Sequence, residues 1–289
     1  MSFDAIVHRL SELDANLYDF ALWTPGGIRS HRFQPCSRCL NSYSVAKAFI
    51  MTAVGLLYDD GRLSPSDFFA RHFPQLKQHP QLGWRIAQVD HALTHRLGWN
   101  EGFLDIDVED TAAYPYEDWL RMVFEHPLAY VPGSTRRYSD ASTYLLSRLI
   151  SQVCQENADA LLYRRLLRPM GFREAAWSRC PLGYPVGATG LYLSAEDTVK
   201  LGALYLQQGV WNGQRLLSQE WVRLAIAREY EFYVMTPNGL IGKAGFFGQG
   251  LVFSWEQGFA AAWHTHTDRA GLNRITACVD AIRAKDLCD

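Results

Sequence analysis

Ser44 and Lys47 are the residues whose types and spacing best suit chemistry. The apolar run behind them, up to residue 58, predicts a buried helix that opens at Ser44. At a spacing of three, the Lys47 amine lies one turn further on the same face and can reach the serine hydroxyl. A serine hydroxyl needs a neighbouring base, and a lysine shielded from water can have its pKa lowered enough to take that proton. Free N–H groups at the helix N-terminus would stabilise an oxyanion, so the arrangement suits acyl transfer.

A Ser-x-x-Lys pair is a weak signal when it stands alone. About one such pair is expected by chance in a chain of this size. The ordinary alternative is a capping serine followed by a solvated lysine. The chemical interpretation therefore depends on companion residues elsewhere in the chain.

Composition and charge describe an ordinary globular protein. The chain has 289 residues, of which 48% are hydrophobic and 20% charged, enough for one large domain or two interleaved ones. A net charge of −2 gives no reason to expect nucleic acid or an anionic membrane as partner. No apolar run reaches the roughly 18 residues that a membrane helix needs. The first residues lack the basic start and apolar core of a signal peptide, so we expect a cytoplasmic protein.

The elements that must position Ser44 follow from apolar spacing and turn residues. A hairpin is predicted over 18–23 and 27–33, and a first helix from the spacing of Phe3 to Leu17. The Ser44 helix should end near Asp59-Asp60-Gly61. Further helices are predicted at 89–97, 119–124, 144–153, 158–167, 191–210 with Ser194 as N-cap, 218–226 and 272–285, and antiparallel strands at 239–257 and 258–267.

This order predicts a discontinuous α/β (α+β) layout. Residues 1–58 and 191–289 should form an antiparallel sheet flanked by helices, with a mostly helical region, 59–190, inserted between them. A ligand is expected in a cleft between two such regions.

Further segments accompany Ser44 in a fixed order. They are ALTHRLGW at 92–99, YVPGS at 130–134 with Tyr138-Ser139-Asp140, GLYLSAED at 190–197, and Lys243-Ala244-Gly245. With the Ser-x-x-Lys pair, they resemble the motifs of the serine β-lactamase-related hydrolases of the class C type, which include D,D-peptidases and esterases of the same penicillin-binding fold. The family patterns are L-L-T-H-T-S-G-L, P-G-x-x-x-x-Y-S-N, G-L-x-S-T-A-x-D and K-T-G. The ordered set covers most of the chain and is far more specific than any single motif.

The resemblance implies roles for particular residues and a β-lactamase/transpeptidase-like fold. Tyr138 would be a second general base, supported by positive charge from Lys47 and Lys243. Lys243 would also hold the electronegative side of the substrate. The oxyanion hole would be the backbone N–H groups of Ser44 and Phe246. Without this context, Tyr138 is a half-buried aromatic residue and Lys243 a solvated charge at a sheet edge.

Two departures from the family patterns bear on the substrate. Asp140 replaces asparagine, which removes a neutral amide and adds a carboxylate that could repel an acidic substrate. Ala244 replaces threonine, whose hydroxyl helps to grip a substrate carboxylate in family members that process β-lactams or D-Ala-D-Ala; Gly245 is retained. Both changes favour an esterase or amidase/peptidase over a true β-lactamase. Aligning Ser139-Asp140-Ala141 with the class A S-D-N motif is less favoured, because no glutamate can be placed as deacylating base.

Other groups of residues have ordinary alternatives. His91, His95, His264 and His266 could suggest a metal, but packing or surface roles are the more usual interpretation, and we expect no metal or cofactor. Cys36 and Cys39 form a C-x-x-C without a second pair, so we expect free thiols among the six cysteines, which include Cys288. No G-x-S-x-G stretch supports an α/β-hydrolase.

The sequence therefore predicts a serine hydrolase that acts on a small-molecule ester, amide or peptide through an acyl-enzyme on Ser44. The alternative, motivated by Asp140 and Ala244, is a catalytically degenerate member of this fold that serves as a ligand-binding or regulatory protein. The oligomeric state is not predicted.

Overall fold

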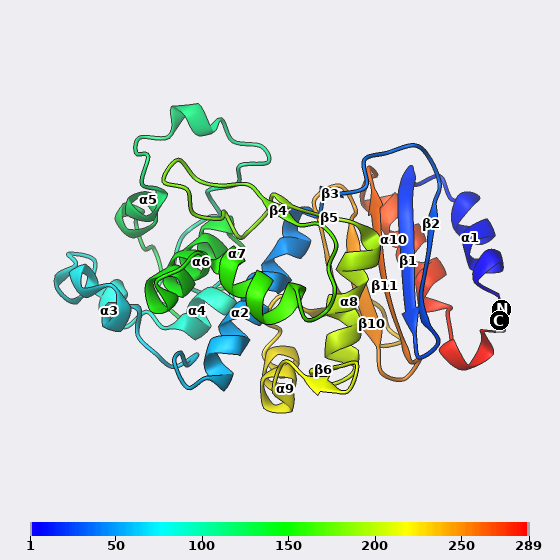
Figure 1. Ribbon diagram of the computed structural model, residues 1–289. Helices are drawn as coiled ribbons and strands as arrows, with labels where there is room; N and C mark the ends of the chain where they lie inside the picture. The colour runs from blue at the N-terminus through cyan, green and yellow to red at the C-terminus, as the bar shows by residue number, and fades with distance from the viewer. Residues whose placement is uncertain (1, 288–289) are drawn as a thin grey trace.

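The main sheet draws its strands from both ends of the chain. The computed structural model describes residues 2–287. Six antiparallel strands lie in the order β2-β1-β11-β10-β9-β8 (Figure 1). Their bounds are β1 Leu17–Thr24, β2 Gly27–Arg32, β8 Tyr233–Val234, β9 Ile241–Ala244, β10 Gly250–Ser254 and β11 Phe259–Thr265. Thr24 pairs with Gly27, which confirms the predicted hairpin, and β1 pairs with β11 along its length.

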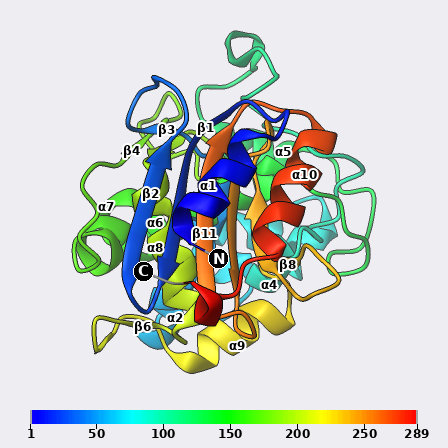
Figure 2. The same ribbon diagram turned by 90° about the vertical axis from the view of Figure 1, so that its right-hand side faces the viewer.

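Helices cover both faces of this sheet. Helices α1 (Phe3–Ser11) and α10 (Arg269–Asp280) lie on the outer face, in front of the sheet in Figure 2. Helix α8 (Ala195–Leu206) packs against β1, β10 and β11 on the inner face. The prediction of an antiparallel sheet flanked by helices is confirmed.

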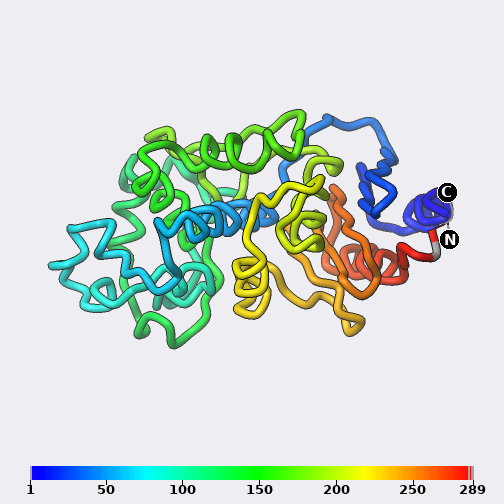
Figure 3. The backbone as a smooth tube through the Cα atoms, turned by 60° about the horizontal axis from the view of Figure 1, so that its bottom comes forward, coloured from blue at the N-terminus to red at the C-terminus, as the bar shows by residue number. Residues whose placement is uncertain are grey.

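The rest of the chain is mostly helical and surrounds α2 (Ala46–Asp59), which runs through the middle of the molecule in Figure 3. Every residue of α2 from Ala46 to Leu57 is buried, which explains why all of them except Lys47 and Thr52 are apolar or glycine. The other helices are α3 Phe69–His72, α4 Val89–Leu93, α5 Trp119–Glu125, α6 Asp140–Cys154, α7 Ala158–Leu162 and α9 Gln219–Ala227. Short helical turns are η1 Tyr43–Val45, η2 Pro74–Gln78, η3 Leu82–Arg85, η4 Thr111–Ala113, η5 Tyr163–Leu167 and η6 Ala284–Asp286. Two small sheets contain β3 Leu40–Asn41, β4 Ala176–Trp177 and β5 Leu191–Leu193, and β6 Val210–Trp211 and β7 Gln214–Arg215.

Two hydrophobic clusters hold these layers together. The larger one extends from the helical part through α2 to the inner face of the sheet, so that Phe49, Leu146 and Ala260 belong to one continuous core. The smaller one packs α1 and α10 on the outer face, around Phe20 and Trp263. The division into 1–58 with 191–289 and 59–190 stays a prediction.

Several predicted helix limits are wrong, each for a local reason. The helix predicted over 191–210 begins at Ala195, because Leu191–Leu193 pairs as β5 with β3 and β4. The predicted N-cap is confirmed, since Ser194 Oγ accepts a hydrogen bond from the N–H of Asp197 at 3.1 Å. The first helix ends at Ser11, and Leu17 instead opens β1. The chain turns between them at Asn16, whose φ of 42° is left-handed.

Within residues 2–287, no helix combines the length and the apolar character needed to cross a membrane.

Candidate active site

Ser44 lies in a strained turn that leads into α2. It belongs to the 3-10 turn η1 rather than to the first position of the α-helix. Tyr43, directly before it, has a left-handed φ of 46°, and its N–H donates to Asn41 Oδ1 at 2.9 Å. Asn41 Oδ1 also accepts from the N–H of Gly190 at 3.2 Å, which ties the turn to the segment before β5. Non-glycine residues in this backbone region are concentrated at functional sites.

Lys47 is fully buried and uses three polar partners. Its Nζ lies 2.9 Å from Ser44 Oγ, 2.9 Å from the carbonyl oxygen of Ala188 and 2.8 Å from Asp140 Oδ1. Burial disfavours the charge, but Tyr138 and Asp140 favour it more strongly, and the pKa of Lys47 is raised. The expected lowering of the Lys47 pKa is therefore wrong. The reasons are the Tyr138 hydroxyl group and the Asp140 carboxylate, which both favour the charged form of the buried lysine.

Tyr138 is the second residue, besides Lys47, whose side chain contacts Ser44 Oγ. Its hydroxyl lies 2.9 Å from Ser44 Oγ, and its side chain is 40% exposed, so it lies on the solvent-accessible side of Ser44. The ammonium groups of Lys47 and Lys243 lie 5.0 and 4.8 Å from the centre of its ring. Ser139 is turned away, since its Oγ exchanges hydrogen bonds with the backbone of Phe103. This geometry favours the tyrosine alignment over the class A alignment.

A buried charge network fixes Lys243 beside Tyr138. Lys243 Nζ donates to Glu231 Oε2 at 2.5 Å, and both side chains are almost fully buried. The second carboxylate oxygen of Glu231 lies 2.9 Å from His95 Nε2. Burial opposes both charges, yet their attraction lowers the pKa of Glu231 and raises the pKa of Lys243. The two groups therefore stay ionised at neutral pH.

His95 completes this network as a neutral ring. Burial lowers its pKa, and its Nδ1 accepts a hydrogen bond from the N–H of Ser139 at 3.3 Å. The proton of the neutral ring is therefore on Nε2, the atom next to Glu231. The His95 ring also packs on the Tyr138 ring, with centroids 4.4 Å apart. Both His95 and Glu231 have left-handed backbones, with φ of 55° and 62°.

The end of β9 provides a backbone donor next to Ser44. A Cβ on Gly245 would lie 2.8 Å from the carbonyl oxygen of Ser42, so only glycine allows this strand to approach the turn that contains Ser44. Gly245 and Phe247 donate their N–H groups to Gln249, at 2.8 and 3.2 Å. Between them, the N–H of Phe246 has no acceptor among residues 2–287. Ala244, two positions earlier, adds no hydroxyl at this edge.

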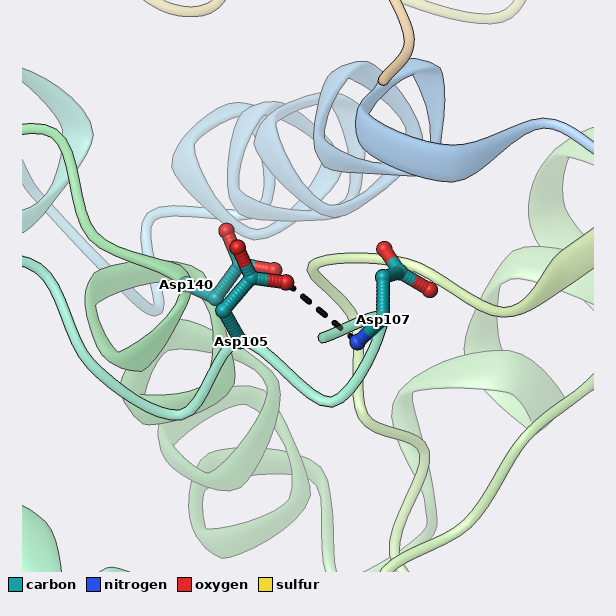
Figure 4. A group of neighbouring side chains, drawn as sticks. All are labelled: Asp105, Asp107 and Asp140. Atoms are coloured by element: carbon teal, nitrogen blue, oxygen red, sulfur yellow. Dashed lines mark hydrogen bonds between the residues drawn. The ribbon is translucent and has the colours of Figure 1, made fainter. Parts of the chain in front are cut away.

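Three carboxylates gather on the other side of Lys47. Oxygens of Asp105, Asp107 and Asp140 all lie within 4.8 Å of one another, and Figure 4 shows the Asp105 and Asp140 side chains next to each other. The backbone N–H of Asp107 donates to Asp105 Oδ1 at 3.3 Å. Burial raises the pKa of Asp105 and of Asp107, and the Lys47 ammonium supplies positive charge to the group through Asp140.

A cavity of about 520 Å³ opens beside Ser44 and Tyr138. Its wall combines the end of β9, the start of α10 and the loop before α6. Lys243, Ala244 and Gly245 form part of this wall. The predicted site residues thus lie around one cavity or, for Lys47 and Asp140, directly behind Ser44.

The other histidines and the cysteines lie elsewhere. His264 Nδ1 is 2.8 Å from Asp19 within the sheet, His266 stacks on Phe247, and His91 accepts from the N–H of Gln88. In the described part of the chain, no histidine or cysteine belongs to a group arranged to hold a metal. Five cysteines, including Cys36 and Cys39, are free thiols, and Cys288 lies outside the described residues.

Sequence reasoning did not identify Glu231, Asp105 or Asp107. Glu231 stands twelve residues before Lys243, in a loop without a recognisable motif. The available signal was indirect: a lysine that lies buried in a site needs a buried counter-charge. The sequence does not show where that counter-charge would be.

Comparison with known proteins identifies the family. The chain belongs to the beta-lactamase family, whose model matches residues 40–277. It is 26% identical over 196 residues to a 6-aminohexanoate-dimer hydrolase of Paenarthrobacter ureafaciens, a match that covers 64% of this chain and 50% of that protein. The chain thus spans about half the length of this curated relative. The predicted family is confirmed.

Solved structures share the fold at low identity. A penicillin-binding protein homologue from Caulobacter crescentus superposes with a TM-score of 0.76 at 16% identity, covering 98% of this chain and 96% of that one. EstCE1, a hydrolase with promiscuous acyltransferase activity, gives a TM-score of 0.75 at 16% identity, covering 96% and 99%. The predicted β-lactamase/transpeptidase-like fold is confirmed.

Proposed function

We propose that this protein is a serine hydrolase that cleaves an ester or amide bond of a small molecule or peptide through an acyl-enzyme on Ser44. The observation that carries the proposal is the position of Ser44 Oγ, 2.9 Å from both Lys47 Nζ and Tyr138 Oη, at the edge of a cavity. Family membership and a relative named for hydrolysis of the 6-aminohexanoate dimer support it.

Tyr138 is the proton acceptor in this mechanism. Lys47 is an unsuitable base in its resting state, because its pKa is raised and its ammonium is paired with Asp140. The ammonium groups of Lys47 and Lys243 lie 5.0 and 4.8 Å from the centre of the Tyr138 ring, where their charge favours proton acceptance by the tyrosine oxygen. Lys47 also orients Ser44 by donating a hydrogen bond to Oγ.

The reaction has two steps. Ser44 Oγ attacks the carbonyl carbon and gives its proton to Tyr138, and the N–H groups of Ser44 and Phe246 stabilise the tetrahedral oxyanion. Collapse breaks the bond to the leaving oxygen or nitrogen, which takes the proton from Tyr138. Water then loses a proton to Tyr138 and attacks the acyl-enzyme, and Ser44 is regenerated with the proton. The mechanism requires no metal or organic cofactor.

The test is covalent labelling followed by intact-protein mass spectrometry. The protein is exposed separately to a fluorophosphonate, a penicillin and a p-nitrophenyl ester, in parallel with Ser44→Ala. A single adduct that is absent in Ser44→Ala is expected, and the reacting probe separates esterase from penicillin-recognising chemistry. Turnover of the p-nitrophenyl ester should fall by about 10²–10⁴-fold in Tyr138→Phe, as is typical for loss of a general base. No adduct with any probe would support the degenerate, ligand-binding alternative.

A further inference from the structure

Tyr138 lies in a segment without regular secondary structure. Residues 136–139 form neither helix nor strand, and α6 begins only at Asp140. The Tyr138 side chain is 40% exposed, yet its hydroxyl lies 2.9 Å from Ser44 Oγ. A partly exposed aromatic side chain on an irregular segment has other rotamers available to it. Neighbouring groups must therefore select the orientation that places the hydroxyl beside Ser44.

His95 contacts three consecutive residues of this segment. Its carbonyl oxygen accepts the N–H of Arg137 at 2.8 Å, and its Nδ1 accepts the N–H of Ser139 at 3.3 Å. The imidazole ring packs on the ring of Tyr138, the residue between them, with centroids 4.4 Å apart and planes inclined by 39°. One residue therefore fixes the backbone on both sides of Tyr138 and also contacts its side chain.

Glu231 fixes His95 in turn. Both side chains are buried, and His95 Nε2 lies 2.9 Å from Glu231 Oε1. The other carboxylate oxygen of Glu231 accepts from Lys243 Nζ at 2.5 Å. Lys243 Nζ lies 4.8 Å from the centre of the Tyr138 ring. A single buried carboxylate thus holds two groups that contact this ring.

The backbone around His95 is shaped for close approach to the Tyr138 segment. His95 has a left-handed φ of 55°, a conformation that is concentrated at functional sites in residues other than glycine. A Cβ on Gly102 would lie 2.4 Å from the carbonyl oxygen of Tyr138, so a side chain at this position would push the two segments apart.

We propose that His95 is a positioning residue: supported by Glu231, it holds the Tyr138 ring in the orientation that places its hydroxyl beside Ser44. This inference rests on the proposed function, in which Tyr138 accepts the proton of Ser44. His95 acts on the reaction through Tyr138, so its removal should slow the chemical step rather than weaken substrate binding. A displacement of a reacting group by about 1 Å can cost about 10²-fold in rate.

The test is a double-mutant cycle on hydrolysis of p-nitrophenyl acetate. His95→Asn removes the ring, while asparagine tolerates a left-handed φ and its Oδ1 can still accept the N–H of Ser139. With Tyr138 present, kcat should fall by about 10- to 100-fold with little change in KM. In Tyr138→Phe, the same substitution should change kcat by less than about twofold, because the hydroxyl that His95 positions is already absent.

The matched control is His264→Asn, which also removes a buried histidine beside a carboxylate, here Asp19 at 2.8 Å. Its effect on kcat should be the same factor with and without the Tyr138 hydroxyl. If circular dichroism shows that His95→Asn does not fold, His95→Gln replaces it, because the longer amide can still donate to Glu231. An equal loss of kcat in both backgrounds, or a loss confined to KM, would overturn the inference.

A second measurement separates this inference from the proposed function. If the wild type neither hydrolyses the ester nor is acylated, the proposed function fails, and crystal structures of the variants decide the inference. In His95→Asn, the Tyr138 hydroxyl should leave its position 2.9 Å from Ser44 Oγ, whereas in His264→Asn it should stay there. A Tyr138 hydroxyl that still contacts Ser44 Oγ in His95→Asn shows that other groups position it and overturns the inference.

Discussion

Asp140 helps to keep Lys47, the buried lysine beside Ser44, in its charged form. An asparagine at this position could hydrogen-bond Lys47 but would not balance its charge. The Asp140 carboxylate lies 2.8 Å from Lys47 Nζ and balances its charge. This contact helps to keep the lysine protonated although its side chain is completely buried. The sequence suggested that the Asp140 carboxylate could repel an acidic substrate. Its pairing with Lys47 offsets this charge inside the protein.

Replacing Asp140 by asparagine tests which group is the base. Loss of an opposite charge at this distance should lower the pKa of Lys47. If the Lys47 ammonium supports an ionised Tyr138, the alkaline limb of the kcat/KM profile should move to lower pH. A pH–rate profile of Asp140→Asn measures this shift.

The control variant is Asp107→Asn, which removes a carboxylate from the same group without contacting Lys47. It should shift the profile much less. A profile in which Asp140→Asn instead moves the acidic limb to lower pH would assign the base to Lys47.

Glu231 gives a prediction about stability. Its pKa in the folded protein is lower than the ordinary value of about 4.3, so the folded state binds its proton more weakly than the unfolded state. Its contribution is complete above the unfolded pKa and is lost as pH falls through the folded pKa. At about pH 7, Glu231→Gln should lower the free energy of unfolding by about 3–5 kcal/mol, because Lys243 is left as an uncompensated buried charge.

Urea unfolding measures the difference in the free energy of unfolding between the wild type and Glu231→Gln. This difference should begin to decrease below about pH 4. Glu125→Gln serves as the control, since Glu125 is exposed and pairs with Arg121 on the same helix turn. It should change stability little at either pH. A difference for Glu231→Gln that does not depend on pH would reject the charge-pair explanation.

At this scale, sequence could predict the residues that carry recognisable motifs and not those that support them. Ser44, Lys47, Tyr138 and Lys243 stand in ordered patterns, and the structure brings all four together. Glu231 reaches Lys243 through tertiary packing and a left-handed backbone, neither of which has a sequence pattern. The direction of the Lys47 pKa shift could not be predicted either, because it depends on the distances from Lys47 to Tyr138 and to Asp140.

Helix α2 packs closely on α9 because its residue at the contact, Gly55, has no side chain. Gly55 lies in its buried middle, where glycine normally destabilises a helix by about 0.5–1 kcal/mol relative to alanine. A Cβ at this position would lie 2.3 Å from Nε1 of Trp221 on α9. The absence of a side chain lets the two helices approach, and α2 carries Lys47 in its first turn.

Gly55→Ala should therefore be destabilising, although alanine is the better helix former. Overpacking against Trp221 is expected to cost about 1–3 kcal/mol, more than the gain in helix propensity. Thermal or urea unfolding measures the change. Gly26→Ala is the comparison, because its Cβ would meet Thr24 Oγ1 at an ordinary 3.6 Å; equal effects of the two substitutions would contradict the packing argument.

Elements with strong local signals were predictable, whereas elements created by long-range pairing were not. The hairpin around Thr24-Pro25-Gly26 and the cap at Ser194 depend on nearby residues, and both are confirmed. Leu191–Leu193 forms a strand because β3 and β4 lie on either side of it. Apolar spacing alone cannot separate such a segment from the first turn of the following helix.

The continuous core predicts how the whole molecule unfolds. The larger cluster joins α2, α6 and the inner face of the sheet, so neither the sheet nor the helical part can lose its packing alone. Circular dichroism and tryptophan fluorescence should therefore give one coincident transition in urea. Two separated transitions would instead indicate that the helical part is an independent folding unit.

The pairing of β1 with β11 has a consequence for folding of the nascent chain. His264 and Asp19 are 245 residues apart, yet they hydrogen-bond at the centre of the sheet. During synthesis, the β1–β2 hairpin has one unpaired edge until β11 leaves the ribosome. Lys243 and Phe246 follow Ser44 by about 200 residues, so Ser44 stays without these neighbouring groups until β9 has been synthesised. A growing chain of this kind should depend on chaperones that cover strand edges until β11 is available for pairing.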